Sequence, residues 1–253
     1  MFRCLGVKGG NIVVQAPAAV GDAQRNERLK DAEKQTAMTL RLYYHPLASY
    51  CWKALIALYE TGVPFEPEFV DLGDPVSRAE FYKLTPLGKF PVLVDEKAGK
   101  GFPESSIIIE YLAIKYPEAA KLIPADRDLA LRVRLSDRFY DLYVHERMQK
   151  IVGDRLRPAN QKDPAGVEQA RADLDNALKL VDRDMESGGW ATGLTFTMAD
   201  CAAAPALYYA NKVAPFGSAH TGAARYLERL MARPSFARVI EEAKPYFAMF
   251  PQA

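Results

Sequence analysis

A hydroxyl and a thiol stand close together in the first turn of a predicted helix. They belong to Ser49 and Cys51, and Tyr44 ends the predicted strand before this turn. The start of a helix has free backbone N–H groups and the positive end of the helix dipole, so it stabilises an anion. A thiolate is such an anion. The pattern therefore predicts a corner that holds the sulfur of a small thiol, while later segments grip the rest of the molecule.

The residues around this corner predict a compact α/β unit. Residues 40–44 are rich in β-forming side chains, and residues 49–61 have apolar side chains at helical spacing before Gly62. Strand and helix patterns then continue in the order β-α-β-α-β-β-α over about 80 residues. The later segments are a strand over 65–70, a helix over 74–84, a strand over 91–94, a partner strand at Phe102 and a helix over 104–116.

The pattern changes after Pro117, because residues 118–126 read as a linker and no convincing strand follows them. Helical spacing predicts helices over 127–150, 164–186, 198–211, 222–232 and 235–243, each bounded by proline or glycine. We therefore expect an α+β protein with an α/β domain over 38–117 and an all-helical domain over 127–253.

One of these helices has a marked start signal. In Phe196-Thr-Met-Ala-Asp-Cys201, Thr197 suits the N-cap and Asp200 the third helical position, which is the pattern of a capping box. Such a cap stabilises a helix by roughly 0.5–2 kcal/mol. We assign it a structural role at the start of a central core helix.

Residues 1–37 differ in character from the rest of the chain. A short apolar patch, interrupted by glycines, precedes a polar and charged run over 22–35. The apolar part is too short and broken for a secretion signal. Because Met38 stands directly before the first strand, we expect a dispensable, disordered arm, and the sequence leaves open whether it belongs to the natural protein.

Composition excludes some classes of function. The chain has 253 residues and a net charge of only +1, so nucleic-acid binding has no electrostatic support. No apolar run approaches the roughly 18 residues that span a bilayer. The cysteines have no CxxC spacing, and the histidines form no metal-spaced cluster with them, which fits a reducing, cytoplasmic compartment and predicts no metal site. These residues are Cys4, Cys51, Cys201, His45, His145 and His220.

Three segments carry a family resemblance. They are Thr85-Pro-Leu-Gly-Lys-Phe-Pro-Val-Leu93, Pro103-Glu-Ser-Ser-Ile-Ile-Ile-Glu-Tyr-Leu112 and the capping box of residues 196–201. In this order, and followed by helices, they make the chain resemble the soluble glutathione transferase superfamily over about residues 38–250, bacterial-like and nearest to the serine-using classes. The resemblance implies a thioredoxin-like first domain that binds glutathione, a helical second domain, and a homodimer.

The resemblance also assigns glutathione contacts to particular residues. It implies a cis bond before Pro91 and pairing of the Val92 backbone with the cysteinyl part of glutathione. Glu104 and Ser105 would hold the γ-glutamyl group: the carboxylate accepts from its ammonium, and the hydroxyl and helix-start N–H groups hold its carboxylate. Lys89 would reach the glycyl carboxylate.

The catalytic side chain is where the sequence departs from the family pattern. Classes that use serine or cysteine place it where this chain has Ala48. Ser49 follows directly and is our first choice, Tyr44 is the second, and the helix-start N–H groups without a dominant side chain are the third. Tyr50 lines up with the cysteine of a bacterial class, whereas Cys51 is expected to pack inward.

The implied chemistry makes glutathione the nucleophile. A thiol of the cysteine type has a pKa of about 8.5, and a hydroxyl donor at a helix start can lower it by about one or two. Glutathione is then a co-substrate, and no metal or organic redox cofactor is needed. Because Ala48 lacks a thiol, addition to or substitution on an electrophile is favoured over thiol–disulfide exchange.

A small hydrophobic electrophile would lie against the helical domain. Tyr140, Tyr143 and Met148 are the candidate pocket residues on its first long helix. Aromatic side chains at this spacing are more often core than pocket, so that alternative stays open. The far side could be closed by Tyr208, Tyr209 and Phe216.

Three functions are compatible with the sequence. The first is a glutathione transferase that conjugates glutathione to an electrophile which the sequence does not specify. The second is a glutathione-dependent isomerase, lyase or dehalogenase, because the family shares the thiolate site among these reactions. The third is a non-catalytic member that binds thiols or partner proteins, which Ala48 makes a real alternative.

Overall fold

A computed structural model describes residues 40–251 of the chain. Contacts divide the chain into residues 1–38 and residues 39–253, and all described residues belong to the second unit. The arm expected over residues 1–37 lies outside the described residues. Within the described part, no helix is both long enough and apolar enough to cross a membrane.

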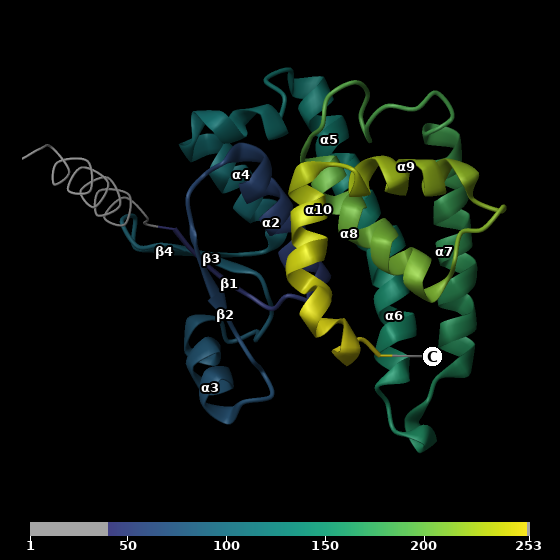
Figure 1. The fold of residues 1–253 in the computed structure, drawn as a ribbon, viewed down its shortest axis with the longest axis horizontal. Coiled ribbons are helices and arrows are strands. Elements are labelled where there is room, and N and C mark those ends of the chain that lie inside the picture. The colour runs from purple at the N-terminus through teal and green to yellow at the C-terminus, as the bar shows by residue number, and fades with distance from the viewer. Residues whose placement is uncertain (1–39, 252–253) are drawn as a thin grey trace, which may run out of the picture. The chain divides into compact units, whose positions relative to one another are not determined.

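The first part of this unit contains a four-stranded sheet with the strand order β2-β1-β3-β4 (Figure 1). The central strands are β1 (Leu40–Tyr44) and β3 (Val92–Asp95), which run antiparallel. Edge strand β2 (Glu66–Phe69) is parallel to β1, and edge strand β4 (Lys100–Pro103) is antiparallel to β3. All four strands overlap the segments in which the sequence predicts strands.

Three helices complete the first domain. They are α2 (Ser49–Thr61), α3 (Pro75–Leu84) and α4 (Ser105–Lys115). Gly62 adopts a left-handed φ of 69° after α2, where the sequence places the end of this helix, and the Asp74 side chain caps the start of α3. The predicted α/β unit with its thioredoxin-like arrangement is therefore confirmed.

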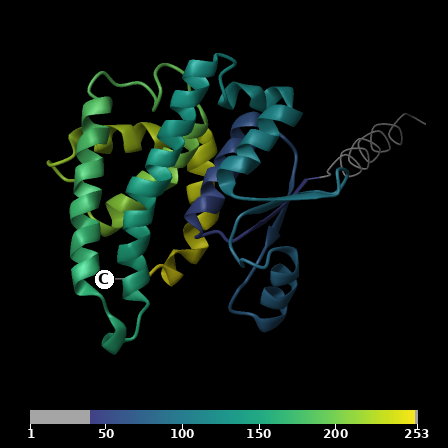
Figure 2. The same ribbon diagram turned by 180° about the vertical axis from the view of Figure 1, so that it is seen from behind.

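The rest of the described chain is helical, as predicted (Figure 2). The α-helices are α5 (Arg127–Phe139), α6 (Glu146–Arg155), α7 (Pro164–Asp184), α8 (Met198–Val213), α9 (Thr221–Met231) and α10 (Pro234–Ala243). The shorter helical segments are η1 (Pro117–Leu122), η2 (Tyr140–His145), η3 (Ala159–Gln161) and η4 (Lys244–Met249).

Two local features differ from the sequence expectation. Segment η1 is a 3₁₀ helix that overlaps the predicted linker, and its residues Ala119 and Leu122 are fully buried against the core. The helix predicted over 127–150 is interrupted by η2, a π-helical segment whose wider turn a 3.6-residue pattern does not reveal. Such segments are frequent at functional sites.

The predicted capping box is present at the start of α8. Asp200 Oδ2 accepts from the N–H of Thr197 at 2.8 Å, and Oδ1 accepts from the Ala191 N–H and the Tyr226 hydroxyl. Asp200 is fully buried, and burial raises its pKa. One carboxylate thus fixes the helix start, the preceding loop and α9 together.

Helix α2 packs against both the sheet and the helical domain. Trp52 is fully buried and contacts the rings of Tyr208, Tyr209 and Phe236. Because one core extends from the sheet into the helices, this contact fixes the start of α2 relative to α8. Tyr209 and Phe216 are buried in this core and the half-buried Tyr208 packs against it, and their role in closing a ligand pocket stays a prediction.

Candidate active site

Three predicted site segments meet at one end of the sheet. Tyr43 in β1 pairs with Val92 at the start of β3, and Val92 pairs with Pro103 at the end of β4. The turn after β1, the Phe90–Pro91 bond and the Glu104–Ser105 step therefore lie at the same end of three neighbouring strands. The strand register therefore explains why these three segments, which the family resemblance assigns to one glutathione site, lie close together.

The backbone before β3 is arranged differently from the prediction in one respect. The bond between Phe90 and Pro91 is cis, as predicted. Val92, however, is paired on both sides in the centre of the sheet and is 1% exposed. Phe90 is half-buried and precedes the first paired residue. The backbone available to a ligand is therefore that of Phe90, and we move the expected contact from Val92 to Phe90.

The start of α4 contains a strained residue. Glu104 has φ 73° and ψ 113°, and among the described residues no other non-glycine residue has a positive φ. Such a conformation costs about 1–3 kcal/mol and is found mostly at ligand sites. Ser105 follows as the first residue of α4 and is 4% exposed, and Lys89 is exposed on the preceding loop. Their contacts with glutathione stay predictions.

The start of α2 presents backbone donors without helical acceptors. Ala48 is the N-cap, and its carbonyl accepts from the N–H groups of Cys51 and Trp52. The N–H groups of Ser49 and Tyr50 come before these and have no acceptor within the helix. No acidic side chain occupies the first turn of this helix. The position therefore favours an anion, as the sequence predicts.

Hydrogen bonds from the core fix the turn in front of this helix. The Trp52 indole N–H donates to the Pro46 carbonyl, and the Tyr209 hydroxyl donates to the Leu47 carbonyl at 3.0 Å. The Leu47 N–H donates to Nδ1 of His45 at 3.2 Å. The turn is thus held by both the thioredoxin-like domain and α8.

Ser49, the first-choice catalytic residue, contacts a histidine of the helical domain. Its Oγ lies 2.9 Å from Nε2 of His145 in η2, and both side chains are buried. Burial, together with the charge of Lys53, lowers the pKa of His145 to about 3, so the ring is neutral at physiological pH. Tyr50 stacks on this ring at 4.0 Å, and its hydroxyl donates to Glu146. The Ser49 hydroxyl therefore has a fixed, uncharged partner.

Helix α2 also carries a buried lysine one turn after the serine. Lys53 is 1% exposed, and its Nζ lies 2.8 Å from both Asp141 Oδ2 and Ser106 Oγ. Asp137 Oδ1 lies 2.6 Å from Nζ without hydrogen-bond geometry, so this contact is an ion pair only. Arg138 pairs with both aspartates from the edge of the cluster.

Sequence reasoning did not identify His145 or Lys53 as site residues. The available signal is a pair of spacings: Ser49 and Lys53 are four residues apart, and so are Asp141 and His145. Residues at this spacing lie on one side of a helix. Nothing in the sequence shows that these two sides meet.

The remaining candidates for the sulfur contact lie in apolar surroundings. Tyr44 is half-buried, and burial, followed by the charge of Glu242, raises the pKa of its hydroxyl. Cys51 is fully buried, and burial raises its pKa to about 12. The expectation that Cys51 packs inward is confirmed, and its thiol stays protonated.

The three predicted electrophile-pocket residues have different surroundings. Tyr143 is 56% exposed, whereas Tyr140 and Met148 are 4% and 2% exposed in the main core. Met148 faces the interior on this side of α6, and its role as a pocket residue stays a prediction. Tyr140 forms part of a pocket wall while remaining buried.

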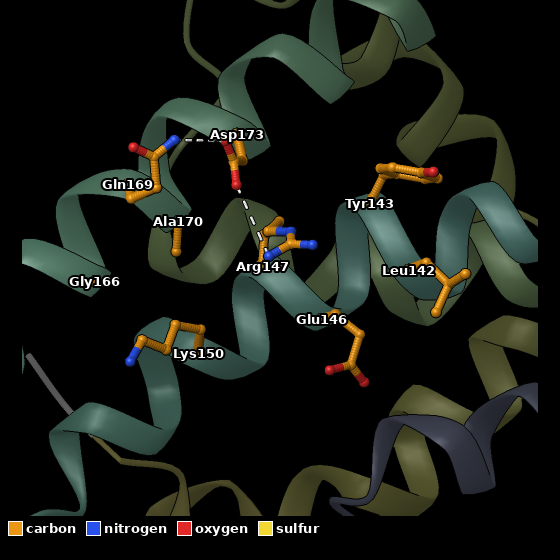
Figure 3. A pocket seen from close by; sticks show the side chains of 9 residues that line it. All are labelled: Leu142, Tyr143, Glu146, Arg147, Lys150, Gly166, Gln169, Ala170 and Asp173. Carbon is orange, nitrogen blue, oxygen red and sulfur yellow. Dashed lines mark hydrogen bonds and ion pairs between the residues drawn. The ribbon is translucent and has the colours of Figure 1, made fainter.

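A groove of about 640 Å³ runs between η2–α6 and α7 (Figure 3). The Arg147–Asp173 ion pair crosses it at 3.8 Å, and Glu146 points away from α7 (Figure 3). Because Glu146 accepts from Tyr50, the groove borders the start of α2. Its lining residues are Leu142, Tyr143, Glu146, Arg147, Lys150, Gly166, Gln169, Ala170 and Asp173.

Metal-ligating side chains do not gather in this region. Across residues 40–251, no group of three or more histidine, cysteine, aspartate or glutamate side chains could hold a metal ion. The chemistry that the described site offers is hydrogen bonding to an anion from a helix start and a buried serine.

Two family models match the chain. The glutathione S-transferase N-terminal domain matches residues 42–120 and the C-terminal domain matches residues 164–229, together more than half of the chain. Glutathione S-transferase GstB of Escherichia coli strain K12 is 23% identical over 189 residues, 74% of this chain and 91% of that protein. A dichloromethane dehalogenase of Methylorubrum extorquens is 48% identical over 62 residues, 24% of this chain and 22% of that protein.

Solved structures show the same likeness along most of the chain. A glutathione S-transferase from Methylobacillus flagellatus with glutathione bound has a TM-score of 0.71 and 27% identity. The match covers 79% of this chain and 98% of that chain. With the site segments at one end of the sheet and both halves of the fold matched, the chain belongs to the soluble glutathione transferase superfamily.

Proposed function

We propose that this protein binds glutathione as a co-substrate, stabilises its thiolate and conjugates it to a small hydrophobic electrophile. The observation that carries the proposal is the convergence of the start of α2, Phe90 and the Glu104–Ser105 step at one end of the sheet. Family membership supports glutathione as the thiol. No nucleic-acid or membrane partner enters the proposal.

The peptide part of glutathione would lie across the end of the sheet. Glu104 and the start of α4, with Ser105, would hold the charged γ-glutamyl group, and the strain at Glu104 supports this role. The Phe90 backbone would pair with the cysteinyl residue beside Pro91, and the exposed Lys89 would reach the glycyl carboxylate.

The sulfur would lie at the start of α2, as in the serine-using classes. The N–H groups of Ser49 and Tyr50 supply two donors there. Because His145 is neutral, its Nε2–H can donate to Ser49 Oγ and leave the Ser49 proton for the thiolate. Hydrogen bonds in such a chain strengthen one another.

The electrophile would approach from the groove beside Tyr50. Tyr143 offers an exposed aromatic face, and Glu146 links the groove to Tyr50. Tyr140 supports the neighbouring wall from the core. The Leu142, Tyr143 and Ala170 side chains would contact the apolar part of the substrate, beside the charged side chains of the same groove.

We expect the protein to be a cytoplasmic homodimer. The two cysteines of the described residues are free and buried, which fits a reducing compartment. Exposed apolar side chains lie on α4 and α5, where a second copy could cover them. They are Ile107, Ile114, Leu131 and Leu135.

Two other functions have specific support. The local likeness to a dichloromethane dehalogenase supports another reaction of the glutathione thiolate, such as dehalogenation. The lack of a reactive group at Ala48 and the burial of Ser49 support a non-catalytic protein that binds thiols or partner proteins. A glutathione-dependent isomerase or lyase would use the same site.

Two measurements on the purified protein test the proposal. Isothermal titration calorimetry measures the Kd of glutathione, and absorbance measures its conjugation to 1-chloro-2,4-dinitrobenzene. We expect both binding and conjugation. Binding without conjugation of any electrophile tried would favour the non-catalytic alternative. Absence of binding would contradict the transferase and the other glutathione-dependent reactions, and would leave a non-catalytic, partner-binding protein.

Ser105→Ala tests the location of the site. Removing a hydroxyl that bonds a charged carboxylate costs about 1.5–3 kcal/mol, so the Kd of glutathione should rise roughly tenfold to a hundredfold. Ser218→Ala removes an exposed hydroxyl in a loop and is the control. An unchanged Kd in folded Ser105→Ala would show that glutathione binds elsewhere.

A further inference from the structure

The charged cluster around Lys53 is buried at an unusual depth. The side chains of Lys53, Asp137 and Asp141 are 1%, 2% and 5% exposed. A buried ion pair must recover the hydration that both charges lose, and an apolar group in the same space is often at least as stabilising. Stability is therefore a weak explanation for this cluster.

The cluster forms the second of two contacts between the same two segments. Ser49 of α2 meets His145 of η2 at 2.9 Å, and Lys53 of α2 meets Asp141 of η2 at 2.8 Å. The two residues on each segment are four positions apart. A slip of η2 along α2 would therefore break both contacts together.

The cluster also includes the helix that starts at the predicted γ-glutamyl site. Ser106 of α4 accepts from Lys53 Nζ at 2.8 Å and donates to Asp137 at 2.8 Å. Ser106 directly follows Ser105 in the chain. Lys53 thus joins the start of α4, the first turns of α2 and η2.

We propose that Lys53 is a positioning residue that, through Asp137 and Asp141, holds η2 so that His145 stays against Ser49. This inference rests on the proposed function, in which Ser49 contacts the glutathione sulfur. Lys53 does not reach the substrate and acts through His145. Its positive charge also disfavours a second positive charge on the ring, which keeps His145 a neutral partner for Ser49.

A double-mutant cycle tests whether Lys53 acts through Ser49. Lys53→Met removes the charge with little change in length, and Ser49→Ala removes the hydroxyl. For kcat/KM of conjugation, we expect each single variant to lose about tenfold and the double variant to lose no more than that. If the losses in kcat/KM of the two single variants multiply in the double variant, the proposal is overturned. It is also overturned if Lys53→Met has the kcat/KM of the wild type.

Two further variants distinguish loss of His145 positioning from misfolding of Lys53→Met. Among the described residues, Lys53→Met leaves the two aspartates with Arg138 as their cation. Lys53→Arg restores the charge, and we expect it to recover most of the activity. The triple variant Lys53→Met, Asp137→Asn, Asp141→Asn has no charge at these three positions, so it should fold and still show a reduced kcat/KM. A kcat/KM equal to that of the wild type in this variant overturns the proposal. Lys121→Met removes an exposed lysine and is the control.

A readout without glutathione separates this inference from the proposed function. The ¹⁵N resonances of the His145 ring report its tautomer and its hydrogen bond to Ser49. We expect Lys53→Met to shift them as Ser49→Ala does, and Lys121→Met to leave them unchanged. If the wild type does not bind glutathione but these shifts occur, the proposed function fails and the positioning of His145 by Lys53 stands. Unchanged resonances in folded Lys53→Met overturn the inference.

Discussion

Ser49 Oγ lies 2.9 Å from Nε2 of His145, although the two residues are 96 positions apart in the chain. The contact joins the predicted sulfur site of the first domain to the π-helical segment of the second. It gives Ser49 a fixed hydrogen-bond partner, and it is the reason to expect the serine hydroxyl, rather than Tyr44, to face a thiolate.

Replacing Ser49 should weaken ionisation of bound glutathione. We expect Ser49→Ala to raise the pKa of the bound thiol by about one, because one charge-assisted hydrogen bond is lost. At a pH below that pKa, kcat/KM should fall about tenfold. The pH dependence of kcat/KM measures this, with Ser218→Ala as the control. An unchanged profile would exclude Ser49 and make Tyr44→Phe the next variant.

Buried His145 should make stability depend on pH. Its pKa is about 3 in the folded protein and about 6.5 in an unfolded chain. As the pH falls from 6.5 towards 3, the unfolded chain takes up a proton that the folded protein does not, so stability is lost. From pH 7 to pH 5 this loss is about 2 kcal/mol.

Urea unfolding of His145→Gln at the two pH values checks this prediction. The variant lacks the titrating ring, so its free energy of unfolding should fall by about 2 kcal/mol less than that of the wild type over this range. Equal losses in both proteins would show that the His145 ring is accessible to protons in the folded state.

The two cysteines of the described residues should be unreactive in the folded protein. Cys51 and Cys201 are fully buried and free, and burial raises the pKa of both thiols. In a Cys4→Ser background, we expect Ellman's reagent to titrate no thiol before denaturation and both thiols after it. Reaction of one thiol in the native state would reopen a role for Cys51 in thiol–disulfide exchange.

The capping carboxylate of α8 should be a large contributor to stability. Asp200→Ala removes the cap and leaves the buried Tyr226 hydroxyl without its acceptor, which together cost about 2–4 kcal/mol. Thermal or urea unfolding measures this loss. Asp128→Ala, an exposed acid in the first turn of α5, should change stability by no more than about 0.5 kcal/mol. Similar effects of both variants would contradict the anchoring role of Asp200.

Local patterns predicted most of the fold. Gly62, Asp74 and Thr197 mark helix ends through contacts within a few residues of themselves, and the structure confirms each. The π-helical η2 escaped prediction because its one wider turn does not change the apolar spacing that signals a helix. The sequence did not predict η1 as a helical segment, because its burial depends on contacts with distant parts of the core.

The sequence by itself determined the order of the elements, the family and the segments of the candidate site, because neighbouring residues set these features. Only the tertiary structure decided what the side chains in those segments meet. Ser49 faces His145, Lys53 meets Asp141 88 positions away, and Met148 lies in the core. These contacts depend on how α2 packs against η2 and α6, and packing between distant helices is set by the whole core rather than by any local pattern.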